Sequence, residues 1–241
     1  MDNSIAYITL NRQRGLRFQL DIIANNVANI DTSGFRREGI LFSEYVIAKT
    51  NAESVSMADL NSRFVSSEAG ELYGSNGNLD IAIEGDGYFA IDAENEVLLT
   101  RSGSFQRSET GFLVTSTGSR VLDIGQAPIF LPPNGSQIEI ANDGTVSVDG
   151  LEQAQIGIFS GEAVETAPSR VGNTAFSIAG APIPLEGARL RQGALEGSNI
   201  KAIEEIAQMI EVTRAYERAE NLMRDTDERV RRTVEILGQA I

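Results

Sequence analysis

The feature that most constrains the fold is a long C-terminal segment that contains neither glycine nor proline. Between Gly197 and Gly238 lie forty residues without either type. Residues suited to a buried seam recur there every seven positions, at Met209, Tyr216, Met223, Val230 and Leu237. The offset three places on carries Val212, Ala219, Thr226 and Thr233, and a neighbouring stripe upstream carries Ile203, Ile206 and Ile210. This spacing predicts one long helix with the a/d seam of a coiled coil.

Charge spacing supports the same helix. Four acidic residues each precede a basic residue by four positions, in the pairs Glu220–Arg224, Asp225–Arg229, Asp227–Arg231 and Glu228–Arg232. Such a pair contributes only about 0.3–0.5 kcal/mol, whereas burial of a large apolar side chain contributes roughly 1.5–3 kcal/mol. The seam therefore determines the structure, and Ser198-Asn199 is expected to cap the N-terminus of the helix.

The N-terminal end carries a second, shorter seam. Its apolar residues step by four, three, four and three positions through Leu16, Leu20, Ile23, Val27 and Ile30. The sequence Asp-Thr-Ser-Gly at residues 31–34 is typical of a turn, so this helix is expected to end near Asn29 after roughly 28 residues.

Three asparagines occur within five positions at the end of this helix, as Asn25, Asn26 and Asn29. Asparagine is a mediocre helix former, so the cluster needs an explanation. Asn25 and Asn29 are expected one turn apart on a helix face, where amides that donate and accept suit hydrogen bonds between protomers. The alternative is that Asn29 only helps to end the helix and that Asn25 is solvated.

The middle of the chain differs chemically from both ends. The net charge of the chain is −14, and residues 41–188 supply all of it, with six cations and twenty anions. All six prolines and 17 of the 23 glycines lie in the same segment. The two ends are thus similar to each other and flank an acidic, turn-rich middle.

Short runs of alternating apolar residues predict β-strands in this middle. They are Leu79-Ile81-Ile83, Ile138-Ile140, Val146-Val148 and Ile156-Ile158. Turn signals separate them, at residues 75–77, 85–87, 117–118, 134–135, 142–144 and 149–150. Their close spacing favours an antiparallel sandwich or barrel over a parallel sheet. Arg36–Tyr45 is compatible with an extended chain, and Lys49–Ala69 is polar and is expected to be a loop.

The predicted fold class is α plus all-β, with the terminal helices paired as a coiled coil and a central antiparallel β domain inserted between them. The parts are an N-terminal helix and turn (1–35), an extended linker (36–70), the acidic β domain (71–188) and the C-terminal helix (189–241). A helix of forty residues is about 60 Å long, which exceeds the width of such a domain.

Two arrangements follow for the exposed part of the seam. One is a self-contained helical hairpin that caps the β domain. The other is a coiled coil that packs against copies of itself or of related chains, and a head-to-tail contact of this kind generates a helical filament. In that arrangement the acidic middle faces outward, where like charge keeps it solvated.

Composition excludes several classes of function. The chain has no Cys and no His, which excludes a disulfide, a thiol nucleophile, a Ser-His-Asp triad and the usual zinc sites. The charge of −14 argues against a nucleic-acid partner, which requires cations to displace counterions. No run of eighteen apolar residues occurs, so no membrane insertion is expected. The N-terminus lacks the pattern of a cleaved secretory signal.

Motifs that suggest ligands are weak. Asp86-Gly87 and Asn142-Asp143-Gly144 resemble parts of calcium loops, but both lack the remaining ligand spacing and are interpreted as hairpin turns. Gly85 and Gly87 lack the third glycine of a dinucleotide fingerprint, so no cofactor is expected. The twenty acidic residues of the middle leave one alternative of another class open, a carbohydrate-binding or carbohydrate-active β domain.

Several motifs resemble those of one known family. Ala24–Phe35, with the sequence Ala-Asn-Asn-Val-Ala-Asn-Ile-Asp-Thr-Ser-Gly-Phe, is similar to the N-terminal signature of bacterial flagellar rod and hook proteins. The same family order continues through Leu79–Phe89, Thr100–Phe105 with Gly111–Thr115, Gly193–Asn199 and Arg214–Glu217. Val27 and Thr213 depart from the family pattern without removing an apolar seam position. Within the family, the Met1-Asp2 start and the short middle are most similar to proximal-rod members, with distal-rod or hook subunits as the alternative.

The resemblance implies a structural, non-enzymatic subunit of the rod, the axial shaft that crosses the periplasm and transmits torque to the hook. It implies partners among copies of itself and neighbouring proximal-rod and distal-rod subunits, and uncleaved export by the flagellar type III apparatus. It also implies terminal segments that are disordered in the monomer and fold on assembly. The expected assembly interface consists of the two seams and the asparagines: Leu16, Leu20, Ile23, Asn25, Asn26, Val27, Asn29, Ile30, Ile203, Ile206, Met209, Ile210, Val212, Tyr216, Met223, Val230 and Leu237.

Overall fold

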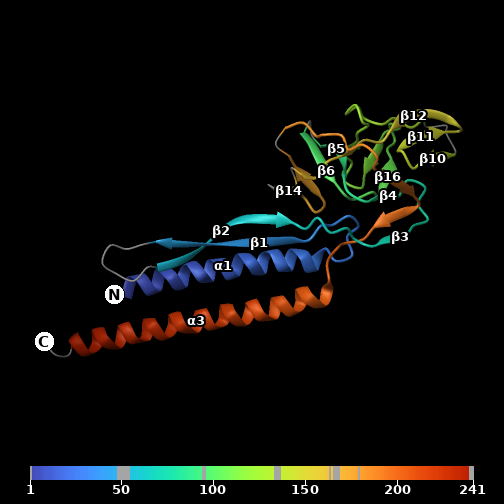
Figure 1. Cartoon of the computed structure of the whole chain (residues 1–241). Helices are drawn as coiled ribbons and strands as arrows, with labels where there is room; N and C mark the ends of the chain where they lie inside the picture. Colours follow the sequence, from blue (N-terminus) through green and yellow to red (C-terminus); the bar gives the residue numbers. More distant parts are fainter. Residues whose placement is uncertain are drawn as a thin grey trace. The chain divides into compact units, whose positions relative to one another are not determined.

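The computed structural model describes residues 2–47, 55–93, 96–132, 137–162, 164, 169–178 and 180–238. The chain divides into two compact units (Figure 1). The helical unit comprises Met1–Val27, Ile40–Ser62 and Lys201–Ile241, and the β unit comprises Ala28–Gly39 and Arg63–Ile200. Both ends of the chain thus belong to the helical unit.

Two long helices dominate the helical unit. Helix α1 spans Asp2–Ala28 and helix α3 spans Ala202–Gly238. Within this unit they run side by side in opposite directions (Figure 1). Both predicted helices are confirmed, and α1 ends within one residue of the predicted Asn29.

The predicted cap of the C-terminal helix is wrong. Helix α3 begins at Ala202, and Glu205 N donates to Lys201 O at 3.1 Å. Asn199 lies before the helix, where its Oδ1 accepts from Arg37 N at 2.7 Å and its Nδ2 donates to Glu68 O at 2.8 Å. Asn199 therefore holds two segments of the β unit together, a role that its local sequence does not reveal.

The segment predicted as a linker forms a β-ribbon. Strand β1 (Glu38–Ile47) and strand β2 (Val55–Val65) make a two-stranded sheet. The prediction of a loop over Lys49–Ala69 is wrong for Val55–Val65, and residues 48–54 lie outside the described part of the chain. Pairing with a neighbouring strand gave this polar segment an extended conformation that its composition does not favour.

The largest sheet of the β unit has the strand order β14-β15-β6-β5-β9-β8-β7, with β13 also paired to β5. Its strands are β5 (Tyr88–Ala93), β6 (Glu96–Thr100), β7 (Phe105–Arg107), β8 (Leu113–Thr115), β9 (Arg120–Val121), β13 (Ile158–Phe159), β14 (Ser169–Val171) and β15 (Ala175–Ser177).

Three smaller sheets complete the β unit. Strands β10 (Ile138–Ile140), β11 (Thr145–Val148) and β12 (Leu151–Gln155) form a three-stranded sheet. Strand β4 (Ile81–Glu84) pairs with β16 (Arg189–Gln192), and β3 (Leu72–Gly74) pairs with β17 (Ala194–Glu196). The recorded pairings in the β unit are antiparallel, which confirms the predicted antiparallel β architecture.

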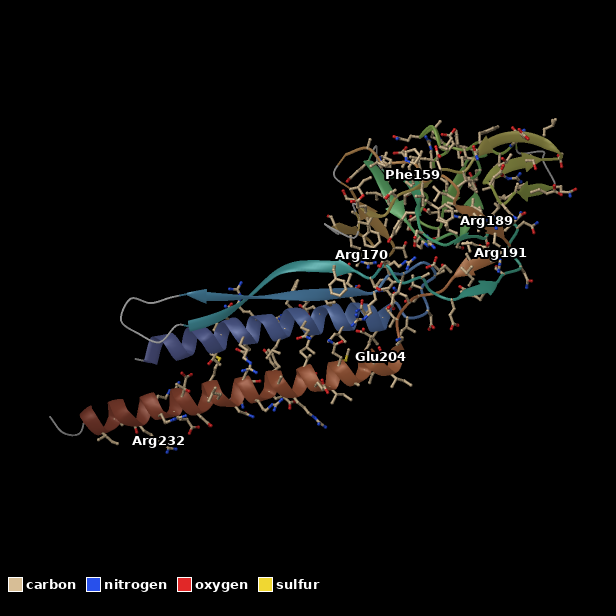
Figure 2. The ribbon with its side chains drawn as sticks, viewed as in Figure 1. Phe159, Arg170, Arg189, Arg191, Glu204 and Arg232 are labelled. Carbon is tan, nitrogen blue, oxygen red and sulfur yellow. The ribbon has the colours of Figure 1, made fainter. Side chains whose placement is uncertain are left out.

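The core of the β unit uses the predicted alternating residues. The main apolar cluster includes Ile81, Ile83, Ile140, Val146, Val148, Ile156 and Ile158. A second cluster surrounds Phe159, which is fully buried and labelled in Figure 2. Alternation places these side chains on the inner faces of short strands, as the sequence pattern indicates.

The turn between β11 and β12 explains one glycine. Val148 pairs with Leu151, so Asp149 and Gly150 form a two-residue loop. Their φ angles are +51° and +79°, as expected for a type I′ hairpin, which favours Asp-Gly. The predicted turn at 149–150 is confirmed, while the one at 134–135 lies outside the described residues.

Candidate assembly interface

The predicted interface residues of α1 fall into two groups. Ile23 and Asn26 are buried, and Asn29, in the turn after the helix, is buried as well. The side chains of Leu16, Leu20, Val27 and Ile30 are partly buried, whereas Asn25 is exposed. Asn25 and Asn29 were expected to share a face of the helix, but α1 ends at Ala28, so Asn29 lies outside it.

Asn26 joins the two helices of the helical unit. Its Nδ2 donates to Oε2 of Glu205 at 3.3 Å, and both residues are about 1 % exposed. Asn29 instead accepts a hydrogen bond from Thr32 Oγ1 at 3.2 Å, in the turn that ends α1. Asn26 therefore forms a hydrogen bond from α1 to α3.

Helix α3 buries only part of its predicted seam. Val212 and Ala219 are buried, and Met209, Tyr216 and Met223 are partly buried. Val230 and Leu237 lie where the structure does not describe side chains. Glu204 and Arg232, labelled near the two ends of the helix in Figure 2, form exposed pairs with Lys201 and Glu228.

The upstream stripe of α3 is exposed. Ile203 is 85 % exposed, and Ile206 and Ile210 are each 48 % exposed. Large aliphatic side chains cost free energy when they stay in water, roughly 1.5–3 kcal/mol each relative to burial. Three of them within eight residues form a contiguous apolar strip, typical of a surface that another chain covers.

An open groove runs between α1 and α3. Leu16 lines one side, and Glu211, Val212, Arg214, Ala215, Glu217, Arg218 and Asn221 line the other. The two helices therefore leave space between them near Leu16 and Val212. They are joined by the hydrogen bond of Asn26 with Glu205, near the C-terminal end of α1 and the N-terminal end of α3. The groove is lined by both charged and apolar side chains, and the isoleucine strip presents apolar surface that the described residues leave exposed.

A buried ion cluster lies in the β unit, beside the chain segments that lead to the helices. Oε1 of Glu196 lies 3.0 Å from Nη2 of Arg36 and accepts from Gly70 N at 2.9 Å. Its Oε2 accepts from Nε of Arg101. The three charged side chains are at most 4 % exposed. One carboxylate thus joins two cations inside the β unit.

Backbone oxygens complete this cluster. Nη2 of Arg101 donates to Ile83 O at 3.1 Å and also to Gly85 O, and its Nη1 donates to Gly87 O. Arg36 similarly donates to Ser67 O at 3.1 Å. Buried charges are tolerated when they form hydrogen bonds. Here two arginines share one carboxylate, and main-chain carbonyl oxygens accept further hydrogen bonds from both guanidinium groups.

Gly34 lets the chain pass close to Arg101. Its φ is +68°, and a Cβ atom built on it would lie 2.3 Å from Ser102 N. Gly34 N also donates to Glu196 O at 2.8 Å. Only glycine fits this left-handed position against a neighbouring backbone.

Phe35 anchors the same segment in the core. It is fully buried, and the guanidinium of Arg170 lies over its ring at 4.3 Å and over that of Phe176 at 4.7 Å. Arg170, labelled in Figure 2, also pairs with Glu38 and donates to Arg36 O at 2.6 Å. Phe35 is therefore a core residue of the β unit.

The sequence analysis did not identify Arg36, Arg101, Glu196, Glu38 and Arg170 as positioning residues. No local pattern links residues so far apart in the chain. One signal was available: arginines are rare in the acidic middle, and an isolated cation there is expected to have a carboxylate partner.

Among the described residues no three Asp or Glu side chains gather closely enough to hold a metal ion. None of the described helices is both long and apolar enough to span a membrane.

Asp143 lies in the β10–β11 turn, which confirms the predicted hairpin. Thr145 N donates a hydrogen bond to its carboxylate at 3.0 Å, and this bond lowers the pKa of Asp143.

Three segments of the chain match known protein families. Residues 8–36 match "Flagella basal body rod protein", residues 82–148 match "Flagellar hook protein FlgE/F/G D1 domain", and residues 191–236 match "Flagellar basal body rod FlgEFG protein C-terminal". The buried cluster takes one residue from each segment, Arg36, Arg101 and Glu196 in that order. The ion cluster thus connects the three segments that match separate family models.

Related proteins match almost the whole chain. The flagellar basal-body rod protein FlgF of Rhizobium meliloti is 35% identical over 235 residues, which cover 96% of this chain and 97% of the relative. FlgF of Caulobacter vibrioides is 34% identical over 249 residues, with 99% of both chains covered. FlgG of Bacillus subtilis is 29% identical over 250 residues, covering 92% of this chain and 94% of the relative.

Proposed function

This chain belongs to the flagellar basal-body rod protein family and is most similar to its FlgF members, and we propose that it builds the proximal rod through its terminal helices. The rod role follows from the family, which confirms the resemblance seen in the sequence motifs. The FlgF relatives at 34–35% identity favour an FlgF-like subunit over an FlgG-like one at 29%. The match of residues 82–148 to a flagellar domain disfavours the carbohydrate-active alternative.

The observation that carries the assembly mechanism is the uncovered apolar surface of α3. Ile203, Ile206 and Ile210 are exposed, and an open groove separates α1 from α3 beside Leu16. In the assembled rod, α1 and α3 pair as a coiled coil, and helices of neighbouring subunits cover the strip and the groove. A contact of this kind does not close on itself, so it propagates as a shaft.

The proposed interface retains the two seams and the asparagines. Asn26 fixes the register between α1 and α3 through Glu205, and Asn25, an exposed residue of α1, is part of the surface that contacts a neighbouring subunit. The remaining interface positions lie on the seams: Leu16, Leu20, Ile23, Val27, Asn29 and Ile30 at the N-terminal end, and Ile203, Ile206, Met209, Ile210, Val212, Tyr216, Met223, Val230 and Leu237 on α3.

The cellular role follows from the rod position. The subunit spans part of the periplasm, contacts copies of itself and neighbouring proximal-rod and distal-rod proteins, and transmits torque mechanically rather than by catalysis. It reaches this site through the flagellar type III export apparatus without cleavage. A monomer whose seams lack partners gains too little burial to offset the conformational entropy of ordered helices, so the termini fold on assembly.

Deletion of residues 202–241 tests the proposal. It removes α3 but keeps Glu196 and Asn199, which hold the β unit together. We expect the truncated chain to retain a cooperatively folded β unit in thermal unfolding and to be absent from isolated basal bodies. Incorporation of the truncated chain, with normal swimming in soft agar, would overturn assembly through the terminal helices.

Cross-linking to immediate neighbours in isolated basal bodies tests the proximal position. Mass spectrometry of the linked peptides identifies which rod proteins lie beside this chain. Links to other proximal-rod subunits are expected. Links only to distal-rod or hook subunits would assign the chain to the distal part of the shaft.

A further inference from the structure

One face of the β unit presents exposed aromatic surface beside an arginine. Phe112 and Phe130 pair across an antiparallel bridge, with their ring centres 5.6 Å apart in an edge-to-face arrangement. Phe130 is 45 % exposed and is the exposed one among the phenylalanines whose side chains are described. Together with the partly exposed ring of Phe112 beside it, Phe130 forms an exposed aromatic surface on an acidic domain.

Arg120 completes this surface. Its guanidinium carbon lies 4.8 Å from the centre of the Phe112 ring. Arg120 on β9 lies opposite Val114 on β8, and Val114 lies opposite Gln106 on β7. Residues that are directly opposite each other point to the same face of a sheet, so Gln106 and Arg120 lie on the same side of the β7–β8–β9 sheet. We name Gln106, Phe112, Arg120 and Phe130 the aromatic–arginine patch. Aromatic residues and arginine are the types most enriched in protein interfaces.

The charge of Arg120 has no partner among the described residues of this chain. Arg101 and Arg170 pair with buried carboxylates, and Arg63 lies 3.9 Å from Glu38. Arg120 forms no ion pair with a described carboxylate, although Asp92 is opposite it on β5. Its guanidinium lies on an aromatic ring at the surface, where it is available to an acidic partner.

The same unit carries a complementary acidic face. Glu139 pairs in register with Ser147, and Ser147 with Glu152, so the three side chains form one row across β10, β11 and β12. Both glutamates are exposed, and the opposite side of these strands is packed into the core through Ile140, Val146 and Val148. Strands β10, β11 and β12 contain no Lys or Arg. This row, Glu139, Ser147 and Glu152, is the acidic row.

We propose that the aromatic–arginine patch of one subunit binds the acidic row of the next copy of this chain. The contact is heterologous, because two different surfaces of one unit meet, and it therefore propagates rather than closing. Residues 41–188 carry six cations and twenty anions, so the β units of two copies repel each other overall. A contact between them is favoured where a basic side chain of one copy faces acidic side chains of the next. The inference rests on the proposed rod function and adds a second contact, between β units, to the one between helices.

Disulfide trapping tests the contact directly. The chain contains no Cys, so engineered cysteines are the only thiols it has. The double variant Gln106→Cys/Ser147→Cys places one thiol in the patch and one in the acidic row. Mild oxidation of isolated basal bodies is expected to give a ladder of linked subunits on non-reducing gels. Gln106→Cys/Ser169→Cys, which moves the second thiol to exposed β14, is the matched control and is expected to give no ladder.

Charge reversal separates a specific contact from a folding defect. In the trapping background, Arg120→Glu is expected to reduce the linked fraction at least tenfold. Adding Glu139→Arg and Glu152→Arg to that variant is expected to restore most of the ladder, because the signs match again. A folding defect caused by Arg120→Glu would not be repaired by these two added substitutions. Unchanged linking in the Arg120→Glu variant would overturn the role of this charge.

Three failures are distinguishable. If the variants enter basal bodies and support swimming, yet no 106–147 disulfide forms, the β-unit contact is wrong while the rod function stands. If the 106-containing subunit links only to a different protein, the partner assignment to a second copy is wrong. If the unmodified, tagged chain is absent from basal bodies, the rod function fails, and the contact that depends on it fails as well.

Discussion

Arg101 and Glu196 lie 95 positions apart in the sequence and form an ion pair whose side chains are 1 % and 2 % exposed. Glu196 comes six residues before α3, and the same carboxylate binds Arg36, which follows α1 by eight residues. The segments that lead into both helices are therefore fixed to one point of the β unit.

Removal of Arg101 takes away one of the two cations that pair with this buried carboxylate and leaves its Oε2 without that partner. For Arg101→Met we expect a loss of about 3–5 kcal/mol in the free energy of unfolding, since the volume is kept and the charge is lost. Urea denaturation followed by near-UV circular dichroism of the β unit measures the change.

Arg191→Met is the matched control for that substitution. Arg191 pairs with Glu84, but their side chains are 57 % and 34 % exposed. Water screens such a pair, so the loss is expected to stay within about 1 kcal/mol. Equal effects of the two substitutions would show that burial of the Arg101 pair does not matter.

Gly34 is predicted to be intolerant of a methyl group. Gly34→Ala places a Cβ atom against the backbone of Arg101 and Ser102 at a φ of +68°, which we expect to cost about 2–5 kcal/mol. Gly118→Ala has a φ of +89° with nothing within 4 Å, so only the backbone strain of about 1–2 kcal/mol applies. Thermal unfolding of both variants compares them, and equal midpoints would contradict the close approach at Gly34.

Asn26→Asp is predicted to impair assembly by placing two carboxylates together. The introduced carboxylate would face Glu205 in a buried position, and like charges there disfavour the pairing of α1 with α3. Incorporation into basal bodies is expected to fall strongly, and adding Glu205→Gln is expected to restore it because the amide again donates to a carboxylate. Ala24→Asp, at an exposed position outside the proposed interface, serves as a control for added charge near the end of α1. Failure of Glu205→Gln to rescue would argue that Asn26 acts elsewhere.

The exposed isoleucines of α3 are predicted to matter for assembly and not for folding of the β unit. Substitution of Ile203, Ile206 and Ile210 by Ser removes apolar surface that is already in water in the free chain. The unfolding midpoint of the β unit is expected to stay unchanged, while swimming-ring diameter falls sharply. Substituting Asp225, Asp227 and Glu228 on the same helix by Ser provides a control with three changes at exposed positions outside the seam. Normal swimming of the isoleucine variant would show that this strip is not buried in the rod.

Asp143 is predicted to titrate below an ordinary aspartate. The hydrogen bond from Thr145 N, followed by that from its hydroxyl, stabilises the carboxylate and lowers its pKa. Because the folded-state pKa lies below the unfolded one, the contribution to stability is complete above the unfolded-state pKa and is lost as pH falls through the folded-state value. Carboxyl NMR titration measures the midpoint, and Thr145→Val, which keeps the amide, is expected to move it partway back. A midpoint at the ordinary value would contradict this turn geometry.

Periodicity predicted the elements whose formation depends on local sequence. The heptad spacing from Met209 onward predicted α3, and alternating residues such as Val146 and Val148 predicted β11 and its inward-facing side chains. Turn chemistry at Asp149-Gly150 predicted the hairpin between β11 and β12. In each of these cases, the residues that carry the signal are neighbours in the chain.

Structure that depends on distant partners was not accessible in the same way. Val55–Val65 has a polar sequence and becomes a strand because β1 lies beside it. Asn199 looks like a helix cap, but its amide is used by Arg37 and Glu68 instead. The ion cluster of Arg36, Arg101 and Glu196 depends on three separate segments, and no single sequence window contains two of them.

The attachment of three segments at Glu196 has a consequence for how such subunits can change in size. The ionic contacts join Arg36, Arg101 and Glu196 across long intervening stretches of the chain. Glu38, Gly70 and Arg170 in these stretches also contact this region, so extra residues leave it untouched only when they are inserted in exposed turns away from them. Each doubling of a flexible loop adds only about 0.6 kcal/mol of closure entropy. Such turns of the β unit can therefore lengthen in a lineage while the contacts that fix the chain next to both helices are kept.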